Sequence, residues 1–259
     1  MRKLFVFWCM IPLFAISQTK NVVSSDRLFP KNDKIEEFEK ALTAHAQKYH
    51  TGDLSWRVYD ILSGPDAGGY MVTEGPSSWE QLDSRGDISP EHKMDFMKNV
   101  APLTTEKNSS AFTGFRADLS TVQLTDFVDK IAINHVFAKP GFAGDIENMI
   151  KKAKKAWELG SQSVAVYESS ASGPPQFLIV TRYKQGWKER DSSFMKPFKA
   201  RYNTANGEDS YDSFTEGLQK CVESSWSELL ICPLPLLPQL LTCFTAAVVA
   251  PAGGVEKVG

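Results

Sequence analysis

Residues 52–59 read GDLSWRVY and residues 160–167 read GSQSVAVY, and the likeness between the two stretches extends in both directions. With residue 29 aligned on residue 137, positions 29–83 match positions 137–191 without a gap, and eleven of the 55 pairs are identical. Unrelated segments would share roughly three, because each common residue type makes up about 5–10 % of a chain. We therefore interpret the two stretches as copies of one supersecondary unit.

Each copy has the pattern of a strand followed by a helix. The strands are expected at residues 22–29 and 130–137, where apolar and polar residues alternate most clearly in the second copy. Phe38 and Leu42 recur at helical spacing, and their aligned partners in the second copy are also apolar. Both helices are expected to end near a glycine, Gly52 or Gly160, in the left-handed conformation that suits a residue without Cβ.

A hairpin and a second helix follow in each copy. Turn-forming residues separate the expected strands, which lie at residues 55–61 and 69–73 in the first copy and at 163–169 and 177–183 in the second. Ser89-Pro90 is typical of a helix start, with serine as N-cap and proline at the first helical position. The corresponding helix of the second copy contains Tyr211, Phe214, Leu218 and Val222, and residues 112–119 are expected to form the last strand of the first copy.

The resulting order, β-α-β-β-α-β in each copy, is the ferredoxin-like plan, in which two helices cover one face of an antiparallel sheet. A second copy can cover the other face. The sequence therefore predicts an α+β protein of two tandem ferredoxin-like units, residues 18–126 and 127–230, whose antiparallel sheets pack face to face within one chain.

The first residues are typical of a secretory signal peptide. Arg2 and Lys3 give a positive start, an apolar segment follows at residues 4–16, and Ala15 and Ser17 are the small residues expected before a cleavage site. About 13 apolar residues are too few to span a bilayer core, which needs about 20. We expect residues 1–17 to be removed and the protein to be exported, either to a periplasm or into the medium.

Residues 231–259 form an atypical Leu/Pro-rich tail. No charged residue lies between Glu228 and Glu256, and the sequence shows no counterpart of the last strand of the first copy. A poorly packed or disordered end is favoured over a membrane anchor, because three prolines interrupt the apolar segment. A reading-frame change near Leu230 would also explain the abrupt change in composition.

Composition excludes some classes of function. The net charge is −2 and the sequence pI is about 6.1, so there is no basic surface of the kind that nucleic acid requires. The sequence contains no glycine-rich phosphate loop and no serine nucleophile elbow, and we expect no cofactor. The four histidines show no metal-ligand spacing. His45 and His50 are five residues apart and are expected to point in different directions, and His92 is expected to be exposed, so we expect no metal site.

Four residues are candidates for a site. His135 alternates with Ile133 and Phe137 on the apolar face of its strand, so it would reach a cavity between the sheets and could transfer a proton there, although a buried core histidine is the favoured interpretation. Arg27 occupies the aligned position in the first copy. Tyr59 and Tyr167 are repeated on strands and suit either a pocket wall or a core.

The stretch INHVFAKPG (133–141), followed by a helix and by YKQGW (183–187), resembles the antibiotic-monooxygenase-like and NIPSNAP-like members of the dimeric α/β-barrel superfamily. The resemblance implies two ferredoxin-like units that enclose a cavity, here within one chain that would be a monomer or a homodimer. It also implies a small apolar or aromatic ligand. The leading hypothesis is an exported small-molecule-binding protein. The alternatives are a cofactor-independent monooxygenase or isomerase that uses His135, and a structural or interaction protein with a filled barrel.

Overall fold

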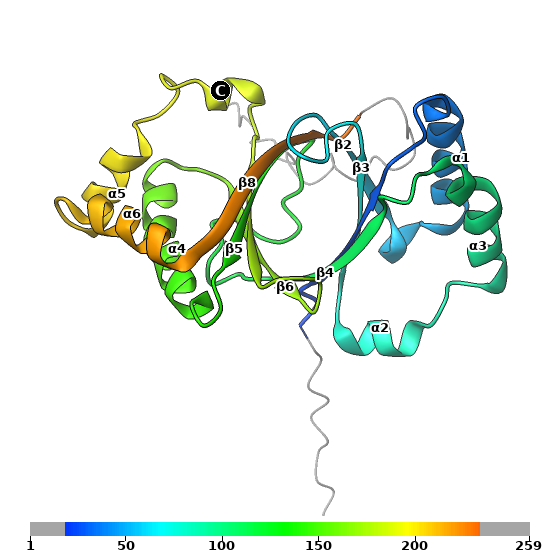
Figure 1. Ribbon diagram of the computed structural model, residues 1–259, viewed down its shortest axis with the longest axis horizontal. Coiled ribbons are helices and arrows are strands. Elements are labelled where there is room, and N and C mark those ends of the chain that lie inside the picture. Colours follow the sequence, from blue (N-terminus) through cyan, green and yellow to red (C-terminus); the bar gives the residue numbers. More distant parts are fainter. Residues whose placement is uncertain (1–18, 234–259) are drawn as a thin grey trace, which may run out of the picture.

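The computed structural model describes residues 19–233, and the expected signal peptide and nearly all of the expected tail lie outside this range. The chain is an α+β protein built on a closed eight-stranded antiparallel barrel. Helices of the first half lie on one side of the barrel and helices of the second half on the opposite side (Figure 1). Among the described residues, no helix has the length and apolar character needed to cross a membrane.

The two halves contribute four strands each. Around the barrel the order is β1-β3-β2-β8-β5-β7-β6-β4, so each half forms a sheet with its strands in the same relative order. The two sheets join edge to edge, β2 to β8 and β4 to β6, and this closes the barrel. The strands are β1 (Val22–Leu28), β2 (Trp56–Ile61), β3 (Tyr70–Ser77), β4 (Ser109–Phe115), β5 (Lys130–Ala138), β6 (Val164–Ser170), β7 (Gln176–Arg182) and β8 (Val222–Ile231).

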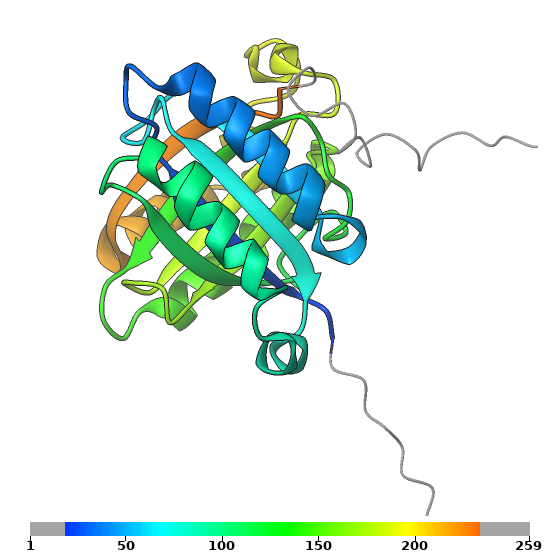
Figure 2. The same ribbon diagram turned by 90° about the vertical axis from the view of Figure 1, so that its right-hand side faces the viewer.

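The helices cover the outer faces of the two sheets. α1 and α3 run side by side over the first sheet (Figure 2), where Phe38, Leu42 and Val100 form a core with Val58 and Val72. A similar core lies under α4 in the second half. The helices are α1 (Ile35–Tyr49), α2 (Trp79–Arg85), α3 (Pro90–Asp95), α4 (Ala143–Leu159), α5 (Phe198–Asn206) and α6 (Ser210–Cys221), with short helical turns η1 (Gly52–Leu54), η2 (Phe96–Val100), η3 (Ala101–Leu103) and η4 (Trp187–Arg190).

The gap-free alignment of the two copies is wrong across the hairpins. Trp56 lies opposite Glu74 on β3, whereas its aligned partner Val164 lies opposite Thr181 on β7, so the second hairpin is one residue shorter. Because side chains alternate between the faces of a sheet, one residue of slip exchanges the two faces. Val72 accordingly packs under the helices, while Val180, its partner in the alignment, lines the barrel interior.

The expectation that the second half lacks a last strand is wrong. That strand is β8, which begins at Val222, the residue expected to end a helix, and pairs with β5 along its length. Trp226 and Leu230 on β8 belong to the inner face, and serines alternate with them on the outer face. An alternation with so few apolar residues gives a weak strand signal.

The two expected helix-end glycines have different roles. Gly52 has φ +60° as expected, whereas Gly160 has φ −91° and the left-handed residue is its neighbour Ser161. At Gly160 the constraint is space, because a Cβ there would lie 2.5 Å from Nη1 of Arg201. That guanidinium is buried and donates to the carbonyl of Ala156 at 2.6 Å, so it cannot move away without losing the bond.

The β2–β3 turn provides a test of the β2–β8 junction. Gly64 has φ +91°, and a Cβ there would lie 2.9 Å from the carbonyl oxygen of Ser227 on β8. Gly68 in the same turn has φ +84° but open space around it. We expect Gly68→Ala to lower the free energy of unfolding by about 1 kcal/mol through backbone strain alone. Gly64→Ala should lower it by about 3 kcal/mol, because the clash also pushes β8 away. Urea unfolding measures both, and equal losses would contradict the close contact.

Candidate functional site

The barrel encloses a cavity of about 450 Å³. Residues from strands of both halves line it, because every second residue of a barrel strand points inward. The wall is largely apolar along the middle of the barrel, with aliphatic side chains and the ring of Phe127. Its aliphatic members are Val23, Met71, Ile131, Ile133, Leu178 and Val180.

His135 lies in this cavity wall, as the alternation of its strand predicted. It is 5 % exposed, and its ring stacks on Trp226 of β8 with the centroids 3.7 Å apart. Nε2 lies 3.0 Å from Oε1 of Glu228, and Nδ1 lies 3.2 Å from Oε1 of Gln176. Both ring nitrogens are therefore held by side chains, so a ligand must displace one of them to bond the ring.

Arg27 reaches the same carboxylate from the other half of the chain. Its guanidinium donates to both oxygens of Glu228, at 2.5 and 2.9 Å, and also forms an ion pair with Asp66 at 2.9 Å. The Glu228 side chain is fully buried. Arg27 and His135, which occupy matching positions in the two copies, thus meet at one carboxylate, and this polar group closes one end of the cavity.

Opposing effects set the charge of Glu228. Burial alone would raise the pKa of the carboxyl, but the hydrogen bonds from Arg27 and His135 hold it below its usual value. For Arg27, burial alone would lower the pKa, and the bonds to Glu228 raise it instead. The pair is therefore a charge-assisted, bidentate interaction, in which each charge depends on the other.

A second polar group lies farther along the barrel. Arg182 is 3 % exposed and donates to the Tyr167 hydroxyl at 3.0 Å. It also bonds the carbonyl oxygens of Gln123, Leu124 and Asp126. Within residues 19–233 it has no carboxylate at ion-pair distance. Among residues 19–233, the groups that hydrogen-bond this buried cation are all neutral.

The two repeated tyrosines both line the cavity but are held differently. The Tyr59 hydroxyl donates to the carbonyl of Val128 at 3.1 Å. Tyr167 accepts from Arg182, and burial raises the pKa of its phenol despite the opposing effect of that guanidinium. Of the sequence candidates, the structure thus brings Arg27 and His135 together at one end and places Tyr167 in the second group.

The sequence did not point to Glu228, Trp226 or Arg182. Glu228 and Trp226 lie on β8, the strand that was not expected, and Glu228 is 93 residues from His135. A usable signal was a glutamate alternating with Trp226 and Leu230 on one face of a strand. Arg182 alternates with Leu178 and Val180 on the inner face of β7, and that alternation was also a usable signal.

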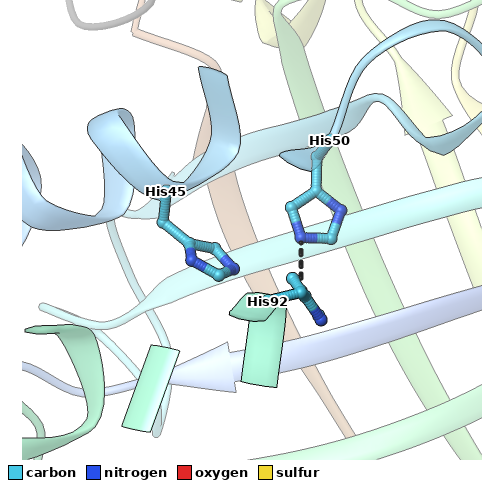
Figure 3. Close-up of side chains that lie close together, drawn as sticks. All are labelled: His45, His50 and His92. Atoms are coloured by element: carbon cyan, nitrogen blue, oxygen red, sulfur yellow. Dashed lines mark hydrogen bonds between the residues drawn. The ribbon is translucent and has the colours of Figure 1, made fainter. Parts of the chain in front are cut away.

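The expectations that His45 and His50 point in different directions and that His92 is exposed are wrong. His45 and His50 point toward one another, and His92 joins them from α3 (Figure 3). His50 Nε2 and His92 Nε2 lie 3.1 Å apart. The error arose because His50 lies just beyond the last residue of α1, where the backbone has left the helical path and the helical spacing rule no longer applies.

Comparisons with known proteins identify the fold. No family model matches the chain, and no curated protein matches its sequence. An anthrone oxidase-like protein of known structure is similar over 83 % of this chain and 92 % of its own, with 12 % identity and a TM-score of 0.50. A candidate monooxygenase of Lactobacillus acidophilus is similar over 82 % of this chain and 93 % of its own, with 11 % identity and a TM-score of 0.47. A candidate monooxygenase of Fusobacterium nucleatum is similar over 81 % of this chain and 91 % of its own, with 12 % identity and a TM-score of 0.47. The anthrone oxidase-like protein has the dimeric α/β-barrel fold, and this chain shares that fold.

The buried carboxylate makes a specific prediction about pH. The pKa of Glu228 is depressed in the folded protein, so its contribution to stability is present above the usual carboxyl value of 4.5 and is lost as pH falls through the folded pKa. We expect Glu228→Gln to lower the free energy of unfolding by about 3 kcal/mol at pH 7, because Arg27 loses its main partner. The deficit should shrink steadily below about pH 4.5.

Urea titrations of wild type and variant between pH 7 and pH 3 measure this deficit. Glu223→Gln is the matched control, because Glu223 is exposed on the same strand. A deficit that is the same at every pH would mean that the carboxylate charge does not stabilise the fold.

Proposed function

We propose that the chain is an exported protein that binds a small apolar or aromatic molecule in its barrel. The observation that carries the proposal is the cavity of about 450 Å³. Ligand sites are typically apolar clefts of about 300–1,000 Å³ with a few placed polar groups, and this cavity fits that description. We interpret the two halves as tandem ferredoxin-like units, because their strands follow the same order and helices cover the outer face of each sheet.

The two polar groups suggest what the ligand carries. His135 pairs with Leu178 and Arg182 pairs with Ile131, so they are separated by four residues along β5, or roughly 13 Å. The charge of Arg27 is already met by Glu228 and Asp66. Arg182 lacks a carboxylate partner among the described residues, so an acidic or strongly electronegative group on the ligand would be favoured there. The ligand we propose is apolar or aromatic over most of its length with such a group at one end.

An enzyme that uses His135 is the second candidate. The His135–Glu228 pair supports it, because a carboxylate on one ring nitrogen orients an imidazole for proton transfer at the other. The fold is shared with an anthrone oxidase-like protein, but a shared fold does not assign an activity. Gln176 occupies the second ring nitrogen, and for this reason binding without turnover is preferred. The cavity counts against the third hypothesis, a structural or interaction protein with a filled barrel.

Export and assembly complete the proposal. The N-terminal sequence favours delivery to a periplasm or to the medium. The barrel is closed within one chain, so a ligand cavity requires no second copy, and the protein would act as a monomer or as a homodimer.

Blocking the cavity tests the binding hypothesis. Ala111 lines the cavity, whereas Ala117 is exposed just beyond the same strand. Anilinonaphthalene sulfonate, an aromatic anion, serves as the probe. We expect its fluorescence to rise on binding, Ala111→Phe to weaken binding at least tenfold, and Ala117→Phe to leave it unchanged. Native mass spectrometry of the untreated protein should show a retained small molecule. Equal binding by both variants would place the probe elsewhere and contradict the proposal.

Oxygen consumption separates the two candidate functions. We expect no uptake of dioxygen when the protein is mixed with anthrone. Uptake that disappears in His135→Ala, with probe binding retained, would establish the enzyme instead. Circular dichroism of the variant is the control for folding.

A further inference from the structure

A second site lies outside the barrel, between α1, the start of α3 and the first sheet. His45, His50 and His92 each bring a ring nitrogen to within 4.8 Å of the other two (Figure 3). His45 is on α1, His50 follows its last residue, and His92 is on α3. Helix and loop segments distant in sequence thus place three imidazoles around one point.

A carboxylate fixes the orientation of each ring. The carboxylate accepts a hydrogen bond from Nδ1, so the proton lies on Nδ1 and the lone pair on Nε2. Carboxylate partners of this kind are the usual second layer around metal-binding histidines, where they set the tautomer and the ring orientation. The three pairs are His45 with Asp95 at 2.8 Å, His50 with Glu74 at 3.1 Å and His92 with Asp87 at 2.7 Å.

With the proton of each ring on Nδ1, none of the three Nε2 atoms accepts a hydrogen bond from a described residue. His45 is 1 % exposed and its Nε2 is buried without a hydrogen-bond partner. Nε2 of His50 and Nε2 of His92 lie 3.1 Å apart, and with the proton of each ring on Nδ1 neither Nε2 can donate to the other. Buried polar atoms are rarely left in this state. A cation bound at the centre would satisfy all three.

The surroundings hold the ligands in place. Trp56 stacks on His50 at 3.5 Å and donates to Glu74 at 3.0 Å, and Arg85 forms an ion pair with the same carboxylate. His92, with 18 % of its side chain exposed, gives solvent access to the site.

Packing alone does not explain the cluster. At the positions of His45 and His50, the second copy has Ala153 and Glu158. Ala153 is buried under α4 in an apolar core, so the same helix packs on the same kind of sheet without histidine. The histidines are therefore a feature that one half has added to a framework that does not need them.

We propose that His45, His50 and His92 bind a divalent transition-metal ion through their Nε2 atoms, with Zn²⁺ as the best fit. In tetrahedral Zn²⁺ sites the Zn–N distance is about 2.0–2.1 Å, which puts ligand nitrogens about 3.3 Å apart. The 3.1 Å between Nε2 of His50 and Nε2 of His92 already matches, and the ligand atom of His45 lies within 4.8 Å of both. Water on the His92 side would be the fourth ligand. The site is separate from the barrel cavity, so it stands independently of the proposed function.

Metal binding to the full-length, untagged protein tests the proposal. Equilibrium dialysis against Zn²⁺ should give one ion per chain, and Co²⁺ should give the intense visible absorption of a tetrahedral ion. His92→Gln removes one ligand at the solvent side and should weaken binding more than tenfold. Asp87→Asn, which keeps the ligands but loses one carboxylate partner, should weaken it about tenfold. Lys93→Gln, an exposed neighbour on α3, is the matched control and should bind as wild type does.

Thermal unfolding gives an independent measure. Zn²⁺ should raise the Tm of the wild type and of Lys93→Gln, because an ion that binds only the folded state stabilises it. A chelator should reverse this rise in Tm. The Tm of His92→Gln should not change when Zn²⁺ is added. Wild-type protein that binds no stoichiometric Zn²⁺ would overturn the proposal. Binding that survives unchanged in both His92→Gln and His45→Gln would overturn it as well.

Discussion

Pairing between the sheet edges of the two halves is the constraint on which the structure depends. An unpaired edge presents a row of free N–H and C=O groups, and each half alone would have two such edges. β4 pairs with β6 and β2 pairs with β8, so each half satisfies the other and no edge remains. Closure curves the sheets around an interior that the outer helices cannot reach. The inner faces of the two sheets contact each other over only part of their area, and the space left between them is the cavity.

The polar contacts inside the barrel also cross between the halves. Glu228 of the second half bonds Arg27 of the first, and His135 closes the group from β5. Unpaired, this buried carboxylate would cost several kcal/mol, so the halves are held in the one arrangement that gives it both partners. A different strand register would move the carboxylate away from at least one of these partners, so the contact helps to fix the register.

Local sequence patterns predicted the features that depend on residues close together in the chain. The helices, the hairpins and the inward direction of His135 followed from periodicity and turn residues. Strand β8 did not, because serines and a glutamate replace the apolar residues that mark a strand. Glu228 and His92 acquire their partners through contacts between distant segments, which one sequence does not encode in any local pattern. The slip between the hairpins shows a further limit, since matching letters can align residues that face opposite sides.

Two different halves within one chain are what permit this site. In the barrel register, Arg27 corresponds to His135, because one lies opposite Met71 and the other opposite Leu178, which occupy equivalent places in the two hairpins. By the same reasoning, Glu228 corresponds to Ala111. A symmetric dimer of identical chains would carry two such carboxylates or none. A single chain with two different halves can instead hold one carboxylate, give it two different partners, and leave the rest of the cavity apolar. The histidine cluster on the outer face is likewise confined to one half.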